Sequence, residues 1–144
     1  MHIHRILATK DGNVFTVRPE QSVRDATALL AQHNIGALIV VNELEWPVGI
    51  VSERDIVRAL SRDERILDRA VDEIMTRHVV TGLPVDDLMS VAKTMSEKHI
   101  RHLPILDGGK LVGMVSIGDV VKAQRDLYQG EVDTLETQIL AQEH

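Results

Sequence analysis

A serine and an aspartate stand three residues apart at two places in the chain, each time within nearly the same stretch of sequence. The first pair is Ser52 and Asp55, in VGIVSERDIVRAL, and the second is Ser116 and Asp119, in VGMVSIGDVVKAQ. Such a pair can cap the helix that follows it, because both side chains accept hydrogen bonds from free N–H groups. A carboxylate can also bind a ribose diol through its two oxygens, and a helix start favours anions. Since the whole unit occurs twice, we favour ligand binding in addition to capping.

These two stretches are part of an internal repeat that covers most of the chain. Pro19 aligns with Pro84 and, after a one-residue deletion, Gly49 aligns with Gly113. Two copies are too few for a repeat array, in which each unit stacks only on its neighbours. We therefore expect two pseudo-symmetric units that pack against each other.

Each copy is expected to fold as β-α-β-β-α. Short apolar segments before a proline favour extended backbone, and Ser22 and Asp87 are suited to cap the first helix of their copies. Two apolar runs then predict strands, and Asp55 and Asp119 are expected to open the second helices. The connecting residues 61–76 are predicted to be helical in part.

The repeat suggests a division of the chain into three parts. Residues 1–64 are the first motif with the N-terminal segment, residues 65–124 are the second motif with a linker helix, and residues 125–144 are a helical tail. Gly130 lowers the helix propensity of that tail. The tail has three apolar candidates for packing contacts: Leu127, Leu135 and Ile139.

The composition indicates a folded chain and excludes several functions. Hydrophobic residues make up 44% and aromatic residues 2%, which predicts a buried core built from aliphatic side chains. The net charge of −6 opposes nonspecific binding to nucleic acid. The absence of cysteine excludes disulfides and thiolate chemistry. No apolar run approaches the ~20 residues of a membrane span and the N-terminus lacks the apolar stretch of a secretion signal, so we expect a cytoplasmic protein.

Catalytic and metal-binding roles are disfavoured by the spacing of the reactive side chains. His99 and His102 stand three apart, but no third metal ligand is set near them in the sequence. Glu53 and Asp55 are expected to point apart at a helix start, which opposes joint acid–base catalysis. The chain contains neither a P-loop nor a GxGxxG motif. We therefore predict no enzyme activity, no catalytic residue and no metal site.

Two other classes of protein are alternatives. Arginines gather in residues 54–65, as in a DNA-linked regulator, but acidic residues interleave with them and indicate a solvated helix face. A protein-interaction or dimerisation module without a ligand is the stronger alternative. It would leave the repeated Ser–Asp pairs as helix caps and nothing more.

The repeated motifs resemble a pair of CBS domains (cystathionine-β-synthase type), the Bateman module, in its small stand-alone bacterial form. The resemblance starts at GNVFTVRPE in the first copy and at VDEIMTRHV in the second, and leaves out only the N-terminal few residues and the tail. It implies an α/β (α+β) fold of two pseudo-symmetric β-α-β-β-α CBS motifs packed through their sheets. It also implies a regulatory signal-transduction module, often a homodimer, with up to two adenosine-nucleotide sites in the cleft.

The resemblance assigns roles to individual residues. Asp55 and Asp119 would bind ribose, with Ser52 and Ser116 as accompanying hydroxyls. AMP is the first expected ligand, and ADP, ATP, NAD-type nucleotides and S-adenosylmethionine are alternatives. The other implied contacts are the adenine-lining segments Thr16, Val17, Arg18 and Thr81, Gly82, Leu83, the apolar walls Ile50 and Met114, and the phosphate contacts Arg101 and His102.

The two implied sites cannot be chemically equal. Three positions carry different side chains in the two copies: Gly36 against Arg101, Ala37 against His102, and Arg54 against Gly118. We expect one well-formed nucleotide site and a second that is weaker or takes another ligand. Asp119 is favoured for the main site because its own copy carries the Arg–His pair, although contacts across the motifs would reverse this. A free module also implies a separate effector protein as partner.

Overall fold

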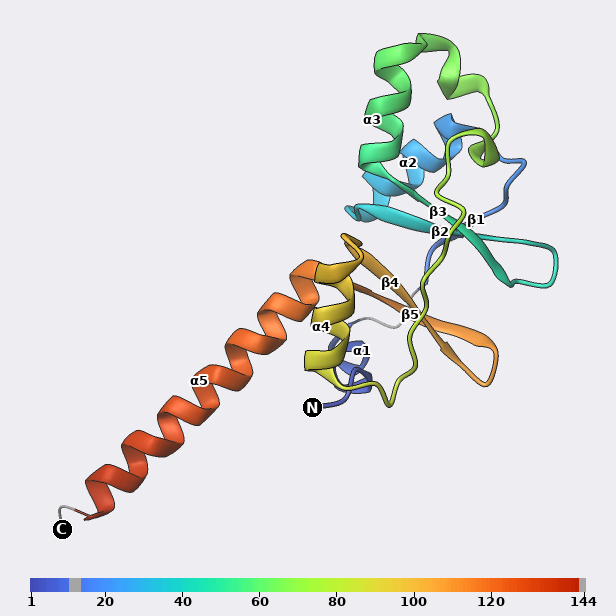
Figure 1. The fold of residues 1–144 in the computed structure, drawn as a ribbon. Coiled ribbons are helices and arrows are strands. Elements are labelled where there is room, and N and C mark those ends of the chain that lie inside the picture. Colours follow the sequence, from blue (N-terminus) through green and yellow to red (C-terminus); the bar gives the residue numbers. More distant parts are fainter. Residues whose placement is uncertain (11–13, 143–144) are drawn as a thin grey trace.

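The computed structural model describes residues 1–10 and 14–142, and the side chains of residues 1–10 and 14–130. Two small sheets face each other, helices lie on their outer sides, and a long C-terminal helix leads away from the body (Figure 1). The first half contains α1 (His4–Thr9), β1 (Thr16–Val17), α2 (Val23–His33), β2 (Ala37–Val41), β3 (Pro47–Ser52) and α3 (Glu53–Arg62). The second half contains the 3-10 helices η1 (Glu64–Asp68) and η2 (Val71–Glu73), then α4 (Leu88–Glu97), β4 (His102–Asp107), β5 (Lys110–Ser116) and α5 (Ile117–Gln142).

The first unit is a three-stranded sheet in the order β1-β2-β3, covered by α2 and α3. β1 runs parallel to β2, with Val17 opposite Val40, and β2 runs antiparallel to β3. Every residue of β2 is buried, as expected for an apolar strand covered on both faces. Leu38 and Val40 pack under the helices, whereas Ile39 lines a small cavity together with Met114 of β5. The first sheet therefore has helices on one side and the second unit on the other.

The second unit has a two-stranded sheet in which β4 runs antiparallel to β5. The predicted first strand of this copy is reduced to one bridge, where Gly82 lies parallel to Ile105. Pro104 explains the difference, because it has no N–H to donate to the next carbonyl of the ladder. The aligned position in the first copy, Ile39, has an N–H, and there the pairing continues over two residues. The expected mixed fold of two similar units is otherwise confirmed.

The helix starts follow the predicted capping chemistry. The Ser22 hydroxyl accepts a hydrogen bond from the N–H of Asp25 over 3.0 Å. Asp87 likewise accepts from the first N–H groups of α4, so both predicted N-caps are confirmed. Asp55 and Asp119 do not open their helices: α3 and α5 begin two residues earlier, and each aspartate lies within the first turn.

The N-terminal segment packs on the second unit, although it precedes the first in the sequence. Ile3 and Ile6 are buried in the second unit's apolar cluster, and backbone hydrogen bonds join the segment to residues 84–88. The linker packs on the first unit instead, where Ile66 and Val71 are buried. Each unit is thus completed by a segment outside its own repeat: the second by the N-terminal segment, and the first by the linker that follows it. The predicted domain boundaries follow the sequence and stay a prediction.

The C-terminal helix is longer than the second repeat requires. α5 is one continuous α-helix from Ile117 to Gln142, so Gly130 does not interrupt it. Leu127 is 43% exposed, so it is not a core contact. Leu135 and Ile139, the other predicted contacts, lie outside the residues whose side chains are described. Among the described residues, no helix is both long and apolar enough to span a membrane.

Close packing of the linker against β3 requires a glycine, which makes a stability prediction possible. A Cβ at Gly49 would lie 2.6 Å from Met75 Sδ and 3.0 Å from the carbonyl oxygen of Thr76. Gly49→Ala should therefore lower the free energy of unfolding by about 1–3 kcal/mol, as measured by urea denaturation. Gly130→Ala is the control, because its added methyl group meets no atom within 4 Å and should change stability by at most about 1 kcal/mol, upward. Equal stability of Gly49→Ala and the parent chain would contradict the close packing.

Candidate functional site

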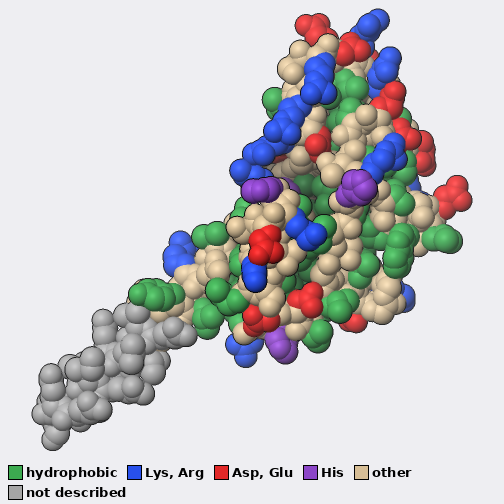
Figure 2. Space-filling view, viewed as in Figure 1, with side chains coloured by type: hydrophobic (Ala, Val, Ile, Leu, Met, Phe, Trp, Pro, Cys, Tyr) green, Lys and Arg blue, Asp and Glu red, His purple; other side chains and the backbone are tan. Residues whose placement is uncertain are grey.

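The larger of the two described cavities opens between the units and has a volume of about 390 Å³. Figure 2 shows the hollow where the two lobes meet, with histidine side chains beside it and Lys or Arg side chains leading down the upper lobe toward it. Its volume lies within the range of about 300–1,000 Å³ typical of small-molecule sites. The expected ligand contacts that line it are Gly36, Ile50, Ser52, Arg54, Asp55, Arg101 and His102.

The Ser–Asp pairs form reciprocal caps at the starts of α3 and α5. The N–H of Ser52 donates to Asp55 Oδ2 over 2.9 Å, and the N–H of Asp55 donates to Ser52 Oγ over 3.2 Å. The second pair repeats this arrangement: Ser116 N–H donates to Asp119 Oδ2 over 2.8 Å, and Asp119 N–H donates to Ser116 Oγ over 3.1 Å. Capping is therefore established for both pairs, and it also fixes the direction of each carboxylate.

The larger cavity combines side chains of both units. Asp55 comes from the first turn of α3, whereas Arg101 and His102 come from the point where the chain enters β4. Gly36 lies against His102, because a Cβ on this glycine would be 3.6 Å from Nε2. We expected Arg101 and His102 to line a site with Asp119 of their own copy. In this cavity they lie with Asp55 of the other copy instead. The two sheets face each other, so the entry to β4 lies opposite the start of α3.

His102 lies among charges of both signs. Burial lowers the pKa of His102, and the positive charges of Lys10 and Arg101 lower it further, while the carboxylates of Asp119 and Glu53 raise it. As a result, the pKa of His102 lies below its ordinary value of 6.5, so the imidazole is mainly neutral at pH 7. An anion bound beside it would favour the protonated imidazolium. Anion binding would therefore be coupled to proton uptake at His102.

Asp119 has the same cap as Asp55 but a different neighbour. Lys10 Nζ donates to Asp119 Oδ2 over 2.8 Å and to the carbonyl of Met114, also over 2.8 Å. Burial raises the pKa of Asp119, but the hydrogen bonds from Lys10 and the N–H of Ser116, with the Lys10 charge, outweigh it and the pKa is lowered. Asp55 has no comparable ion pair among the described side chains.

The remaining expected contacts lie elsewhere. Met114 lines the smaller cavity, which has a volume of about 150 Å³. Arg18 donates a hydrogen bond to the carbonyl of Asn42 instead of facing a cavity. Of the described residues expected at the ligand, the following line neither cavity: Thr16, Val17, Arg18, Ala37, Thr81, Gly82, Leu83, Ser116 and Asp119. Their role as ligand contacts stays a prediction.

The larger cavity also contains residues that were not expected as ligand contacts: Glu53, Arg58, Thr76, His78, Val80, His99 and Ile100. The sequence contained a signal for Arg58, because it lies one helical turn after Arg54 on the same face. Thr76 is placed by two backbone hydrogen bonds with Ile50, of 2.9 and 2.8 Å. Backbone pairing of this kind leaves no side-chain pattern, so the sequence offered no signal for Thr76 or for His78.

The histidines of the cavity do not form a metal site. Within the described part of the chain, no group of three or more His, Asp or Glu side chains is placed to hold a metal ion. His99 and His102 both line the cavity together with Arg101. A hollow lined by guanidinium and imidazole groups with one oriented carboxylate is suited to a polar ligand that carries an anionic group.

Two similar units with a ligand-sized cavity between them form a tandem-domain fold. The profile of the CBS domain matches residues 5–62 and 71–126. The chain belongs to the family of CBS-domain proteins. A solved structure of a protein with CBS domains from Burkholderia ambifaria MC40-6 is 40% identical, with a TM-score of 0.80, and the match covers 85% of this chain and 93% of that chain.

Two further similar structures were solved with ligands. The CBS domain pair of protein MJ0100, in complex with 5-methylthioadenosine and S-adenosyl-L-methionine, is 30% identical with a TM-score of 0.77. That match covers 91% of this chain and 98% of the other. CBSX2, in complex with AMP, is 26% identical with a TM-score of 0.73 over 88% of this chain and 98% of the other.

The charges around His102 make its titration a test of the cavity geometry. Arg101→Gln removes a positive charge and should raise the pKa of His102, whereas Glu53→Gln removes a negative charge and should lower it. Both shifts can be followed by NMR titration of the imidazole. Arg24→Gln is the control, because Arg24 pairs with Asp68 on the surface and should leave the titration unchanged. A fall or no change in the pKa with Arg101→Gln would contradict the placement of Arg101.

Proposed function

We propose that this chain is a regulatory sensor that binds an adenosine nucleotide, AMP in the first instance, in the larger cavity. One observation carries the proposal: the capped carboxylate of Asp55 and the cationic Arg101 enter the same cavity from different units. AMP presents a ribose diol and a phosphate on one small molecule, which matches these two kinds of group. ADP, ATP and NAD-type nucleotides share the same features and are the alternatives.

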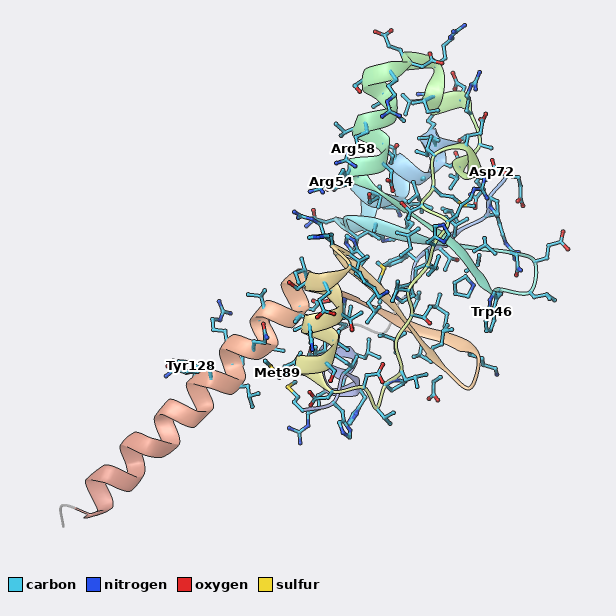
Figure 3. All side chains as sticks on the ribbon, in the orientation of Figure 1. Trp46, Arg54, Arg58, Asp72, Met89 and Tyr128 are labelled. Atoms are coloured by element: carbon cyan, nitrogen blue, oxygen red, sulfur yellow. The ribbon has the colours of Figure 1, made fainter. Side chains whose placement is uncertain are left out.

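Three arginines provide the proposed phosphate contacts. Arg54, Arg58 and Arg101 line the cavity, and among the described side chains none of them forms an ion pair with a carboxylate. Arg54 and Arg58 project from the same side of α3 (Figure 3). By contrast, Arg24 and Arg69 on the surface are paired with acidic side chains. Unpaired guanidinium groups around a cavity are suited to bidentate contacts with phosphate.

Asp55 provides the proposed ribose contact. Its Oδ2 accepts hydrogen bonds from the N–H and the hydroxyl of Ser52, over 2.9 and 3.0 Å. These bonds hold the carboxylate in place before any ligand arrives. No described residue donates to Oδ1, so this oxygen is the one we assign to a ribose hydroxyl. The ligands named for the two similar complexes, AMP and the methylthioadenosine and adenosylmethionine pair, all contain this adenosine group.

The regulatory step would be a shift between arrangements of the two units. A ligand that contacts α3 of the first unit and the entry to β4 of the second binds best when both are held as they are here. The ligand therefore stabilises this arrangement by an amount set by how much more tightly it binds this arrangement than the others. A separate effector protein, in the cytoplasm, would recognise the stabilised arrangement.

Replacing the ribose carboxylate tests the nucleotide site. Asp55→Asn should weaken AMP binding at least about tenfold, because hydrogen bonds to a charged acceptor contribute about 1.5–3 kcal/mol. The dissociation constant would be measured by calorimetry, with thermal shift as a second readout. Asp25→Asn is the matched control, because Asp25 also lies in the first turn of a serine-capped helix but outside the cavity.

The same experiment separates the sensor from its main alternative. Loss of binding with Asp55→Asn but not with Asp25→Asn would support the sensor. If AMP, ADP, ATP, NAD and S-adenosylmethionine all leave the melting temperature of the parent chain unchanged, the sensor proposal fails. An interaction module without a ligand would then be the better description.

We also propose that the chain forms a homodimer through α3 and α5. Val57 and Val121 occupy the same position in the two copies, and they are 65% and 56% exposed. Met89 and Tyr128 are also exposed, and they lie on α4 and on the neighbouring turns of α5 (Figure 3). Apolar side chains that recur at equivalent exposed positions suit a self-complementary interface between two copies.

A charged substitution tests the dimer. The double variant Val57→Glu, Val121→Glu should halve the mass measured by sedimentation equilibrium, because it places charges on both sides of the contact. Leu44→Glu is the control, because Leu44 is 87% exposed in the turn between β2 and β3, away from these helices. An unchanged mass in the double variant, or a monomeric parent chain, would exclude this interface.

A further inference from the structure

The N-terminal segment approaches β5 of the second unit at the glycine that aligns with the one where the linker approaches β3 of the first. A Cβ at Gly113 of β5 would lie 2.6 Å from a side-chain carbon of Leu7, just as a Cβ at Gly49 of β3 would lie 2.6 Å from Met75 Sδ. Gly113 and Gly49 are the aligned glycines of the repeat. Leu7 is therefore the spatial counterpart of Met75.

Three residues further along, each segment carries a residue of different chemistry. His78 follows Met75 and lines the larger cavity with Asp55. Lys10 follows Leu7 and donates directly to the carboxylate of Asp119 over 2.8 Å. One carboxylate thus shares an open cavity with an imidazole, and the other is held by an ammonium group of its own chain.

The space beside the second unit is correspondingly small. The cavity next to Lys10 and Met114 has a volume of about 150 Å³, below the range of about 300–1,000 Å³ typical of ligand pockets. Neither Ser116 nor Asp119 lines it, whereas both Ser52 and Asp55 line the larger one. Neither of the two described cavities therefore reaches the second Ser–Asp pair.

We propose that Lys10 hinders ligand binding at Asp119, so that each chain binds one nucleotide and the N-terminal segment sets that number. The expected count of one nucleotide per chain rests on the function proposed above for the larger cavity. The ammonium takes Oδ2 of Asp119 in a charge-assisted hydrogen bond, and a second hydrogen bond to the Met114 carbonyl holds it there. Oδ1 of Asp119, the counterpart of the Asp55 oxygen that we assign to ribose, is not the atom that Lys10 contacts, but the ammonium beside it neutralises the carboxylate and so weakens its hydrogen bonds with a diol.

The repeat also indicates what an opened second site would bind. Gly36 and Ala37 are the counterparts of Arg101 and His102, so the second site lacks the side chains proposed to hold phosphate. Without Lys10, Asp119 would offer only its carboxylate to a diol. We therefore expect the opened site to bind adenosine and AMP with similar affinity, while the first site prefers AMP.

The experiment counts binding sites by calorimetry with AMP and with adenosine. The parent chain should bind one AMP, and Lys10→Ala should bind two, with the additional site lost again in Lys10→Ala, Asp119→Asn. Lys10→Arg keeps the cation and should bind one. Lys93→Ala is the control, because Lys93 is an exposed lysine paired with Glu97 on α4, and it should bind one. Circular dichroism establishes that each variant is folded.

The proposal stands or falls on whether Lys10→Ala gains a nucleotide-binding site that requires Asp119. If Lys10→Ala gains none, or if the parent chain already has such a site, the proposal is overturned. Failure of the nucleotide site itself would be seen separately, as parent-chain binding that is absent or insensitive to Asp55→Asn. A gained Asp119-dependent site would support the role of Lys10 even then.

A measurement without nucleotide tests the same contact. NMR titration of the carboxyl carbons should show a low pKa for Asp119 in the parent chain and a higher pKa in Lys10→Ala, because the cation and its hydrogen bond are gone. The pKa of His102 should rise in the same variant, because Lys10 lowers it. Unchanged titration of both groups would show that Lys10 does not contact Asp119, and would overturn the proposal.

Discussion

β2 is buried on both faces, and the arrangement of the cavity residues depends on this burial. Leu38 and Val40 need the helices on one side, and Ile39 needs cover on the other, which the second sheet provides. A strand of this kind is stable only between two layers, so the units must pack through their sheets. That packing brings the entry to β4 opposite the start of α3, and the larger cavity opens at this junction.

The reciprocal caps at α3 and α5 give the chain two oriented carboxylates for structural reasons. Ser52 and Asp55 satisfy free N–H groups at the start of α3, and the same bonds fix the direction in which the carboxylate points. Capping and ligand binding thus use one pair of residues without conflict. What separates the two copies is their surroundings: Asp55 faces a cavity with unpaired arginines, whereas Asp119 faces Lys10.

The two copies are completed by segments of unrelated sequence. α1 covers the second unit and the linker covers the first, and each passes close to a glycine of the strand beneath it. Both segments approach the aligned glycines, but their backbones and side chains differ. His78 of one segment lines the larger cavity, whereas Lys10 of the other binds Asp119, which is the difference that we propose separates the two sites.

The repeat, the caps at Ser22 and Asp87 and the order of elements could be predicted from the sequence, because they depend on local patterns and on spacing along the chain. The family could be recognised for the same reason. The partner of the Arg101–His102 pair could not be predicted, since it depends on which strand end faces which helix after the sheets pack. Nor could the places of Lys10 and His78, because backbone contacts and glycine gaps position them and leave no pattern in side-chain type. The sequence by itself determined which groups are present, and the tertiary structure decided which of them meet, because opposed sheets bring together residues that are distant in the chain.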